Sequence, residues 1–180
     1  GSRTKFPVSI SSKSPVVNVD KVLDNMWHGF IKCKVEGYNV IVLHLNPHLY
    51  EARRREIRTV LETVKQSGPF EKWIIMGDFN TVSPLDSAVY ADGKYLQRKK
   101  EQEKVHTRNN NLPDGQLDFA VSQAILDFGF VDAGWADKEN YSKDGFKRRI
   151  DFIYVSPDLR NQIVSCRYIT DDFTAAYSDH

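Results

Sequence analysis

The sequence predicts a mixed α/β fold, in which helices lie between strands and pack on a layered sheet. Three observations indicate this class. Short β-branched runs alternate with two stretches of helical periodicity. Some runs are joined by a few turn residues, as in a hairpin, and others are separated by a helix, as in a crossover. The 180 residues suffice for a single domain spanning residues 1–180, and no linker divides them.

The first half of the chain contains strand, hairpin and helix signals. Its candidate strands are a short run within residues 6–17, FIKCKV (30–35), VIVLHL (40–45) and WIIM (73–76). FIKCKV alternates apolar and lysine side chains, which is typical of a half-exposed strand. EGYN (36–39) predicts a hairpin turn, and VIVLHL is apolar enough for a central strand. Residues 50–66 carry apolar side chains on one helical face and end at SGP.

The second half begins with a polar insertion at residues 86–115, which we expect to be partly helical and mostly solvated. QLDFAVSQAILDFG (116–129) predicts a second amphipathic helix, with Gly129 suited to its C-terminal cap. Two further strands are predicted in RRIDFIYVS (148–156) and QIVSCRYI (162–169). The chain shows no internal repeats.

Composition excludes several classes of function. A net charge of +1 provides no global field that would attract nucleic acid or an anionic membrane. No apolar stretch reaches the length of a membrane span. Cys33 and Cys166 both fall in strand-like runs, so we expect free thiols rather than a disulfide framework or a cysteine metal site. The chain shows no signal peptide, and its compartment is left unassigned.

Polar residues gather at the ends of the predicted strands. They are His44 and Asn46 after VIVL, Asp78 and Asn80 after WIIM, Asp151 within RRIDFIYVS, and Asp179 and His180 at the end of the chain. Each has a structural alternative, such as a turn built on Gly77, Asp78 and Asn80, or an ion pair between Asp151 and a neighbouring arginine. Their recurrence at strand ends, where open α/β sheets bind ligands, favours a functional site.

Taken in order, HLNP, GDFN, RRIDFIYV and YSDH resemble the motifs of the endonuclease/exonuclease/phosphatase family. This is the deoxyribonuclease I-like superfamily of metal-dependent phosphohydrolases. SKSP (12–15) is similar to the segment that precedes the family's His motif. The resemblance covers nearly the whole chain except the polar insertion. It implies a layered β-sandwich flanked by helices, and hydrolysis of a phosphodiester or phosphomonoester by in-line attack of an activated water.

The resemblance implies catalytic roles for residues at each strand end. His180 matches the family's C-terminal catalytic histidine, and Asp151 matches the acid that orients it. Asp78 matches the aspartate that activates the attacking water, and Asn80 matches the amide that holds the scissile phosphate. His44 matches a second histidine that stabilises the phosphoryl oxygens or the leaving group. An Asp–His pair of this kind fixes the imidazole tautomer and raises its basicity.

The resemblance also implies a metal and substrate contacts. Asp179 matches a carboxylate at the metal, for which Mg²⁺ is expected and Mn²⁺ is possible. Asn46, Arg148 and Arg149 are the candidate substrate-binding residues. The two arginines are suited to bidentate phosphate contacts. Solvated charge at the start of a strand is an equally good explanation for them.

The chain also departs from the family pattern. Family members carry an early strand that ends in Asn and a later strand that ends in a metal-binding Glu, and neither is visible here. Glu36 lies in the predicted hairpin turn and is no convincing substitute. We therefore expect a fragment that is incomplete at its N-terminus. Such a fragment should bind Mg²⁺ poorly and show little activity.

Two alternatives remain beside this interpretation. A two-metal, calcineurin-like phosphoesterase also uses a GD strand end, but the GNH-type motifs that it needs are absent. A non-catalytic binding or scaffold domain would keep the fold without a working metal site. The substrate could be nucleic acid, phospholipid or inositol phosphate, acted on by a monomer. Five aromatic residues have two alternative interpretations, either as the lining of a substrate groove or as part of the core. They are Trp27, Tyr90, Tyr95, Trp135 and Tyr141.

Overall fold

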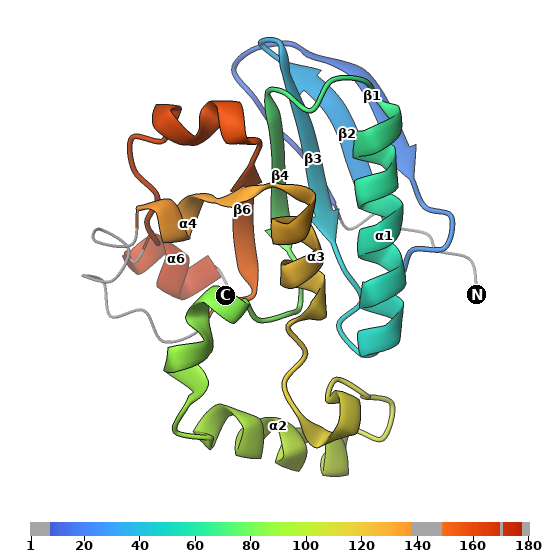
Figure 1. The fold of residues 1–180 in the computed structure, drawn as a ribbon, viewed down its shortest axis with the longest axis vertical. Helices are drawn as coiled ribbons and strands as arrows, with labels where there is room; N and C mark the ends of the chain where they lie inside the picture. The colour runs from blue at the N-terminus through green and yellow to red at the C-terminus, as the bar shows by residue number, and fades with distance from the viewer. Residues whose placement is uncertain (1–7, 138–148, 170, 178–180) are drawn as a thin grey trace.

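The computed structural model describes residues 8–137, 149–169 and 171–177, and within them it contains one six-stranded sheet (Figure 1). The strands are β1 (Val16–Val22), β2 (Phe30–Val35), β3 (Tyr38–His44), β4 (Trp73–Asp78), β5 (Val131–Asp132) and β6 (Asp151–Val155). The α-helices are α1 (Tyr50–Gln66), α2 (Lys94–Val105), α3 (Ala120–Phe128), α4 (Ala133–Ala136) and α6 (Asp172–Tyr177). Short 3-10 helices are η1 (Pro84–Tyr90), η2 (Pro113–Gly115) and η3 (Pro157–Gln162).

The sheet confirms the predicted mixture of hairpins and crossovers. Its strand order is β1-β2-β3-β4-β6-β5. β3 and β4 are parallel because α1 crosses between them, whereas every other neighbouring pair is antiparallel. The β2–β3 hairpin turns at Glu36 and Gly37, which have φ angles of 50° and 83°. These left-handed conformations suit a tight hairpin turn, as EGYN predicted.

Helices α1 and α3 lie side by side over one face of the sheet (Figure 1). The helical periodicity of residues 50–66 is confirmed, because the apolar stripe of α1 is buried against the strands. The core beneath the two helices consists mainly of Ile41, Leu43, Ile57, Val60, Ile75, Phe79, Val121, Ile125, Phe152 and Tyr154. The second layer of the expected sandwich is not found among the described residues, so the opposite face of the sheet is the more open one.

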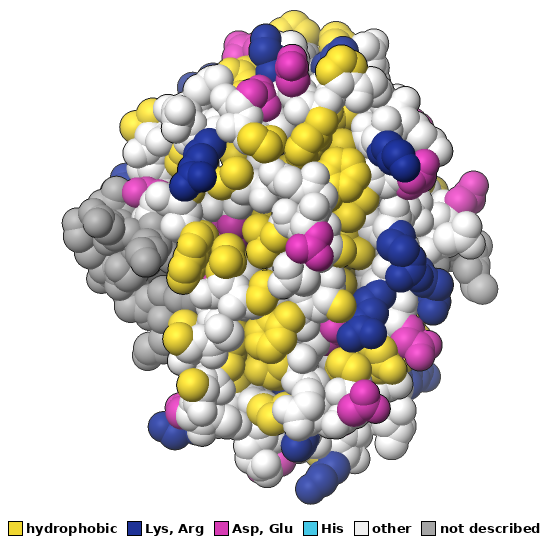
Figure 2. All heavy atoms as spheres, viewed as in Figure 1, with side chains coloured by type: hydrophobic (Ala, Val, Ile, Leu, Met, Phe, Trp, Pro, Cys, Tyr) yellow, Lys and Arg dark blue, Asp and Glu magenta, His cyan; other side chains and the backbone are white. Residues whose placement is uncertain are grey.

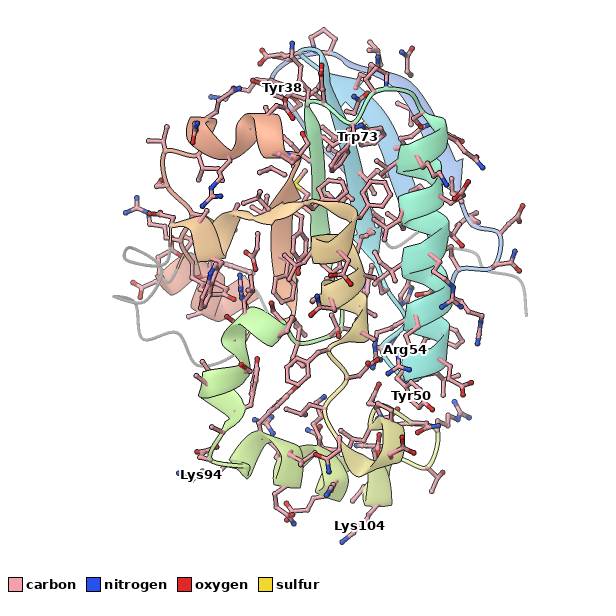
Figure 3. The ribbon with its side chains drawn as sticks, viewed as in Figure 1. Tyr38, Tyr50, Arg54, Trp73, Lys94 and Lys104 are labelled. Carbon is pink, nitrogen blue, oxygen red and sulfur yellow. The ribbon has the colours of Figure 1, made fainter. Side chains whose placement is uncertain are left out.

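Charged residues attach the start of α1 to the segment before α3. The guanidinium of Arg54 lies 4.9 Å from the ring centre of Tyr50, one turn earlier (Figure 3). Arg54 also donates to the buried carboxylate of Asp118 at 2.7 Å. Asp118 in turn accepts from the backbone N–H of Ala120 at 3.1 Å. This bond fixes the turn before α3, which explains why the helix begins at Ala120 and not at residue 116.

Gly77 is required by the close approach of β3 and β4. Its φ is 136°, and a Cβ at this position would lie 2.0 Å from the carbonyl oxygen of Leu43. Only glycine avoids this overlap. The glycine of GDFN therefore serves the packing of two parallel strands at the point where both end.

Two predicted strands differ from the structure. Residues 162–169 form no strand, because the place beside β6 is taken by β5. Val164 and Ile169 in this segment are highly exposed. Cys166 therefore lies outside the sheet, although it and Cys33 are both free thiols as expected. At the N-terminus, β1 begins only at Val16, where pairing with β2 starts.

The polar insertion and the second helix follow the sequence prediction more closely. Residues 86–115 include α2, which has no buried residue, the short helix η2 and most of η1, which begins at Pro84. Gly129 caps α3 with a φ of 111°, as predicted. None of the described helices has both the length and the apolar character that crossing a membrane requires.

Candidate active site

Three of the predicted site residues form a row across neighbouring strands. His44 ends β3, Asp78 ends β4 and Asp151 begins β6. The strand register places His44 opposite Asp78, and Asp78 opposite Asp151. Because β6 runs antiparallel to β4, its first residue lies at the same edge of the sheet as the last residues of β3 and β4. We call His44, Asp78 and Asp151 the polar row.

The alternation of side chains along each strand decides which face the polar row occupies. Leu43 and Phe152 belong to the core beneath α1 and α3. Side chains next to each other in a strand point to opposite faces of a sheet. His44, Asp78 and Asp151 therefore project from the open face, away from the two helices.

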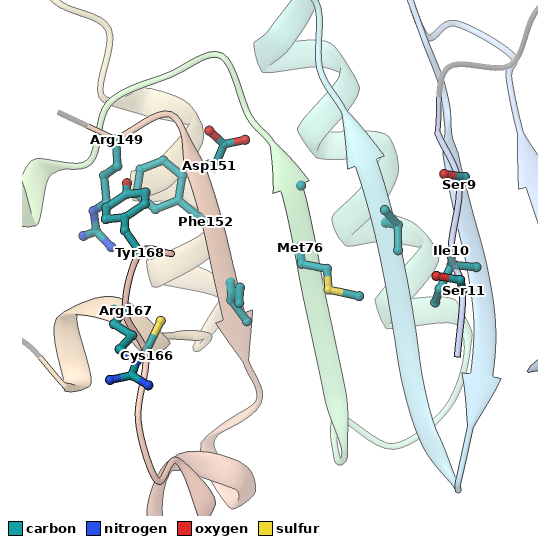
Figure 4. Close-up of a pocket in the computed structure, with 14 residues that line it drawn as sticks. Ser9, Ile10, Ser11, Met76, Arg149, Asp151, Phe152, Cys166, Arg167 and Tyr168 are labelled. Carbon is teal, nitrogen blue, oxygen red and sulfur yellow. The ribbon is translucent and has the colours of Figure 1, made fainter. Parts of the chain in front are cut away.

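A second, apolar row lies beside the polar row on the same face. Val42, Met76 and Ile153 are each two residues from a member of the polar row and are themselves paired in register. They line a cavity of about 420 Å³ that also includes Asp151 (Figure 4). Residues 9–11 and 166–168 form its other walls. The polar row thus borders a largely apolar cavity at its Asp151 end.

Asp78 uses its two carboxylate oxygens differently. Oδ1 accepts from the backbone N–H of Asn80 at 2.7 Å, which forms a turn directly after β4. Oδ2 lies 3.5 Å from Nε2 of His44. Asn80 adopts a left-handed φ of 48°, and its side-chain amide donates to the carbonyl of Leu45 at 3.0 Å. Asp78 therefore takes part in a turn, as the structural alternative predicted, and also faces His44, as a functional site would require. The hydrogen bond within the turn orients the Asp78 carboxylate so that its other oxygen faces His44.

Asn46 is buried and serves the backbone around the start of α1. Its side-chain oxygen accepts from the N–H groups of His48 and Leu49 at 2.8 and 2.9 Å. Its carbonyl oxygen accepts from the guanidinium of Arg53 at 3.0 Å. Asn46 as a whole residue is only 3% exposed. Its side-chain oxygen is thus used by the backbone around the start of α1, and the substrate-binding role of Asn46 stays a prediction.

Arg149 is also buried, which contradicts its interpretation as solvated charge. Its guanidinium donates to Asp86 at 2.6 Å and to Asp132 at 2.7 Å, and it lies 4.6 Å from the ring centre of Phe152. Burial alone would lower the pKa of Arg149, but the two carboxylates outweigh it and raise that pKa. The guanidinium is thus held in an ion triad that joins η1, the start of α4 and β6.

The remaining predicted site residues lie outside the described residues. They are Arg148, Asp179 and His180. The expected hydrogen bond between Asp151 and His180 therefore remains a prediction. Among the residues that the structure describes, no group of three or more His, Cys, Asp or Glu side chains could hold a metal ion. The polar row by itself supplies at most part of a metal site.

A cluster of rings beside His44 was not predicted from the sequence. The imidazole of His28 lies against that of His44, with ring centres 4.1 Å apart and planes inclined by 32°. Trp27 meets the rings of His28 and His48 edge to face, at 6.2 and 5.5 Å. The signal was present in the hairpin: Phe30 pairs with Leu43, so the residues before β2 must lie beside those after β3.

Other aromatic residues considered as groove residues lie elsewhere. Tyr90 is buried, with its ring 5.2 Å from that of Tyr95. Trp135 is exposed on α4, and Tyr141 lies outside the described residues.

Glu56 holds the cluster in place and was also missed. One carboxylate oxygen accepts from the backbone N–H of Trp27 at 2.6 Å, and the other accepts from the backbone N–H of Asn46 at 2.7 Å. Burial raises the pKa of Glu56, although these two donors act in the opposite direction. Glu56 lies in the first half of α1, where charged side chains are common along residues 51–56. Its place beside Ile57, on the buried side of the helix, was the available signal.

Comparison with known proteins settles the family. The model of the Endonuclease/Exonuclease/phosphatase family matches residues 2–180. The chain belongs to this family. No curated protein sequence is significantly similar to it.

Solved structures confirm the deoxyribonuclease I-like fold. One is an AP endonuclease from Archaeoglobus fulgidus, with 20% identity and a TM-score of 0.55. Another is the 3′ phosphatase NExo from Neisseria bound to product DNA hairpin, with 19% identity and a TM-score of 0.55. Each match covers 83% of this family member and 62% of the other chain. The chain thus spans less than two thirds of the length of these structures.

Proposed function

We propose that this chain carries the hydrolytic site of a phosphate-ester hydrolase. The observation that supports this most strongly is the polar row, in which an imidazole and two carboxylates from three adjacent strands meet at one edge of the sheet. Nothing in the packing of the core requires polar side chains there. A phosphate ester placed at this edge would meet acid, base and hydrogen-bonding groups together, which is what its hydrolysis needs.

The proposed chemistry assigns a task to each member of the site. Asp78, fixed by its bond to Asn80, orients the attacking water and accepts its proton. Asn80 lies next to the phosphate, and His44 donates to a phosphoryl or leaving-group oxygen. Asp151 orients His180, whose imidazole completes the proton path. The side chains of Asp78 and Asn80 are held by hydrogen bonds to the backbone of Asn80 and of Leu45, respectively.

We further propose that the reaction depends on Mg²⁺, with Mn²⁺ as a substitute and Asp179 as a ligand. Mg²⁺ binds through one or two carboxylates and retains several waters, which suits a site with few protein oxygens. When bound, it would neutralise charge on the phosphate. The described residues contain no complete site of this kind, and in this proposal Asp179, which lies outside them, supplies a further ligand.

The net charge of +1 favours recognition of the substrate by local groups rather than by a global field. Lys and Arg side chains on the face over α1 are interspersed with Asp and Glu and with hydrophobic side chains (Figure 2). This face, which lies opposite to the polar row, carries charges of both signs, in agreement with the net charge of +1. Nucleic acid, phospholipid and inositol phosphate all remain within the proposed substrate class. We propose that the protein acts as a monomer.

The proposal is tested by assaying the intact protein against a panel of phosphate monoesters and diesters, with Mg²⁺, with Mn²⁺ and with a chelator. Hydrolysis that stops on chelation and returns with Mg²⁺ is the expected result. A folded protein that hydrolyses no member of the panel would favour the binding or scaffold alternative instead.

A further inference from the structure

We infer that Trp27 and His28 form a platform that binds the base of a nucleobase-bearing phosphate ester. This inference rests on the proposed function, because it names the class of substrate for the same site. The platform lies in the loop between β1 and β2 and reaches the polar row through ring contacts. Trp27 contacts His28, His28 contacts His44, and His44 faces Asp78. A phosphate held at the row would therefore place its nucleoside beside the loop.

The position of the platform is fixed by a hydrogen bond to a buried carboxylate. The N–H of Trp27 donates to Glu56, whose other oxygen holds the backbone of Asn46, two residues after His44. Glu56 is only 2% exposed. One carboxylate thus joins the loop to the segment that follows β3. The backbone of Trp27 is therefore held in place, even though the residue is 45% exposed.

An exposed indole in a fixed loop calls for a ligand. A large aromatic side chain normally buries its ring, and here the backbone of Trp27 is anchored while nearly half of the residue stays accessible to solvent. Its two ring neighbours, His28 and His48, are imidazoles that meet it edge to face. His48 is bonded through Nδ1 to Asn109 at 2.9 Å, so this side of the cluster is also held.

The chemistry of the cluster favours a nucleobase over other parts of a phosphate ester. A base offers a flat π-face that stacks on an aromatic side chain, together with polar edges that can bond to imidazoles. An acyl chain would instead need an aliphatic groove, and the ring neighbours of Trp27 are polar. An inositol ring has no flat π-face. Stacking tolerates every base, so we expect little preference among bases.

Fluorescence provides a direct binding test that is independent of turnover. The chain has three tryptophans, of which Trp73 is buried and Trp135 is exposed on α4. In a Trp135→Phe background, fluorescence changes caused by an added ligand therefore report mainly on Trp27. The intact protein is titrated with adenosine 5′-monophosphate, ribose 5-phosphate and inositol phosphate. We expect saturable quenching by the nucleotide and none by the two phosphates that lack a base.

Calorimetry on Trp27 variants then measures how much of the free energy of nucleotide binding depends on the indole. Trp27→Ala should weaken nucleotide binding by about 5- to 150-fold, the range for loss of one stacked base, and leave ribose 5-phosphate binding unchanged. Trp27→Phe should retain most of the affinity. Both variants keep the backbone N–H that bonds to Glu56, so the loop stays anchored. Trp135→Ala is the matched control and should change neither affinity.

The outcomes separate this inference from the proposed function. Equal binding of nucleotide and ribose 5-phosphate by the native protein would overturn the platform, and so would unchanged nucleotide affinity in folded Trp27→Ala. Trp27-dependent binding of inositol phosphate without preference for the nucleotide would overturn the assignment to a base. Nucleotide binding through Trp27 without any phosphate hydrolysis would support the platform and contradict the hydrolase. Hydrolysis without preference for a base would contradict the platform alone.

Discussion

At the scale of single residues, Asp78 shows how one side chain connects fold and chemistry. One oxygen closes the turn after β4, and the other faces His44. The sequence motif could not separate a turn from a site residue, because one oxygen of the carboxylate serves the turn while the other faces His44. Asn46 and Arg149 show the opposite case. Both have residue types that bind phosphate, and both use their polar atoms to hold the protein's own backbone or carboxylates.

Glu56 gives a pH-dependent prediction at this scale. Its pKa is raised in the folded state, so the folded protein binds its proton more tightly than the unfolded chain does. The stability that Glu56 contributes is therefore complete below the ordinary glutamate pKa and is lost as the pH rises through the raised value. Urea unfolding of wild type and Glu56→Gln should show a stability difference that shrinks as the pH rises across that window.

The control for this prediction is Glu62→Gln, an exposed position on the same helix. Its difference from wild type should not follow the same trend. A Glu56→Gln difference that is constant or grows with pH would contradict the assigned direction of the pKa.

At the scale of elements, the Arg149 triad holds together parts of the chain that are far apart in sequence. Arg149→Met keeps much of the side-chain volume but leaves the carboxylates of Asp86 and Asp132 buried without their cation. Loss of one partner of a buried ion pair costs about 3–5 kcal/mol. The free energy of unfolding, measured by denaturant titration, should fall by about that amount. Arg58→Met, at an exposed position on α1, should have little effect, and equal effects of the two changes would show that the triad is not stabilising.

The strand ends give a second prediction at the scale of elements. Gly77→Ala would place a Cβ 2.0 Å from the carbonyl oxygen of Leu43 and keep a φ that alanine disfavours. We expect a loss of more than about 1 kcal/mol in the free energy of unfolding. Gly68→Ala shares the positive φ, but its Cβ would meet nothing within 4 Å, so it isolates the cost of the backbone conformation. If Gly77→Ala lost no more stability than Gly68→Ala, the close approach would carry no energetic weight.

Sequence reasoning succeeded where local pattern decides structure. The apolar periodicity of α1, the EGYN turn and the Gly129 cap depend on neighbouring residues alone. It failed for residues 162–169, because whether an apolar run becomes a strand depends on whether a sheet position is vacant. The platform of Trp27 and His28 was missed for a similar reason. Its place beside His44 follows from strand register, which brings together residues that no local pattern connects.

At the scale of the whole molecule, the two faces of the sheet have different tasks. The face beneath α1 and α3 is filled by the main core. The open face carries the polar row and, beside it, Val42, Met76 and Ile153 at the wall of the cavity. This division explains why the proposed site tolerates half-buried polar groups: they project away from the core that stabilises the fold.

The most direct test of this account compares Asp78→Asn with Asp127→Asn in the intact protein, on a phosphate ester that the wild type hydrolyses with Mg²⁺. Both changes remove one carboxylate charge, but Asp127 lies on α3, across the sheet from the polar row. We predict that Asp78→Asn lowers turnover by about 10²- to 10⁴-fold with little change in melting temperature, and that Asp127→Asn leaves turnover unchanged. Wild-type turnover in a folded Asp78→Asn variant would show that the polar row is not the catalytic site.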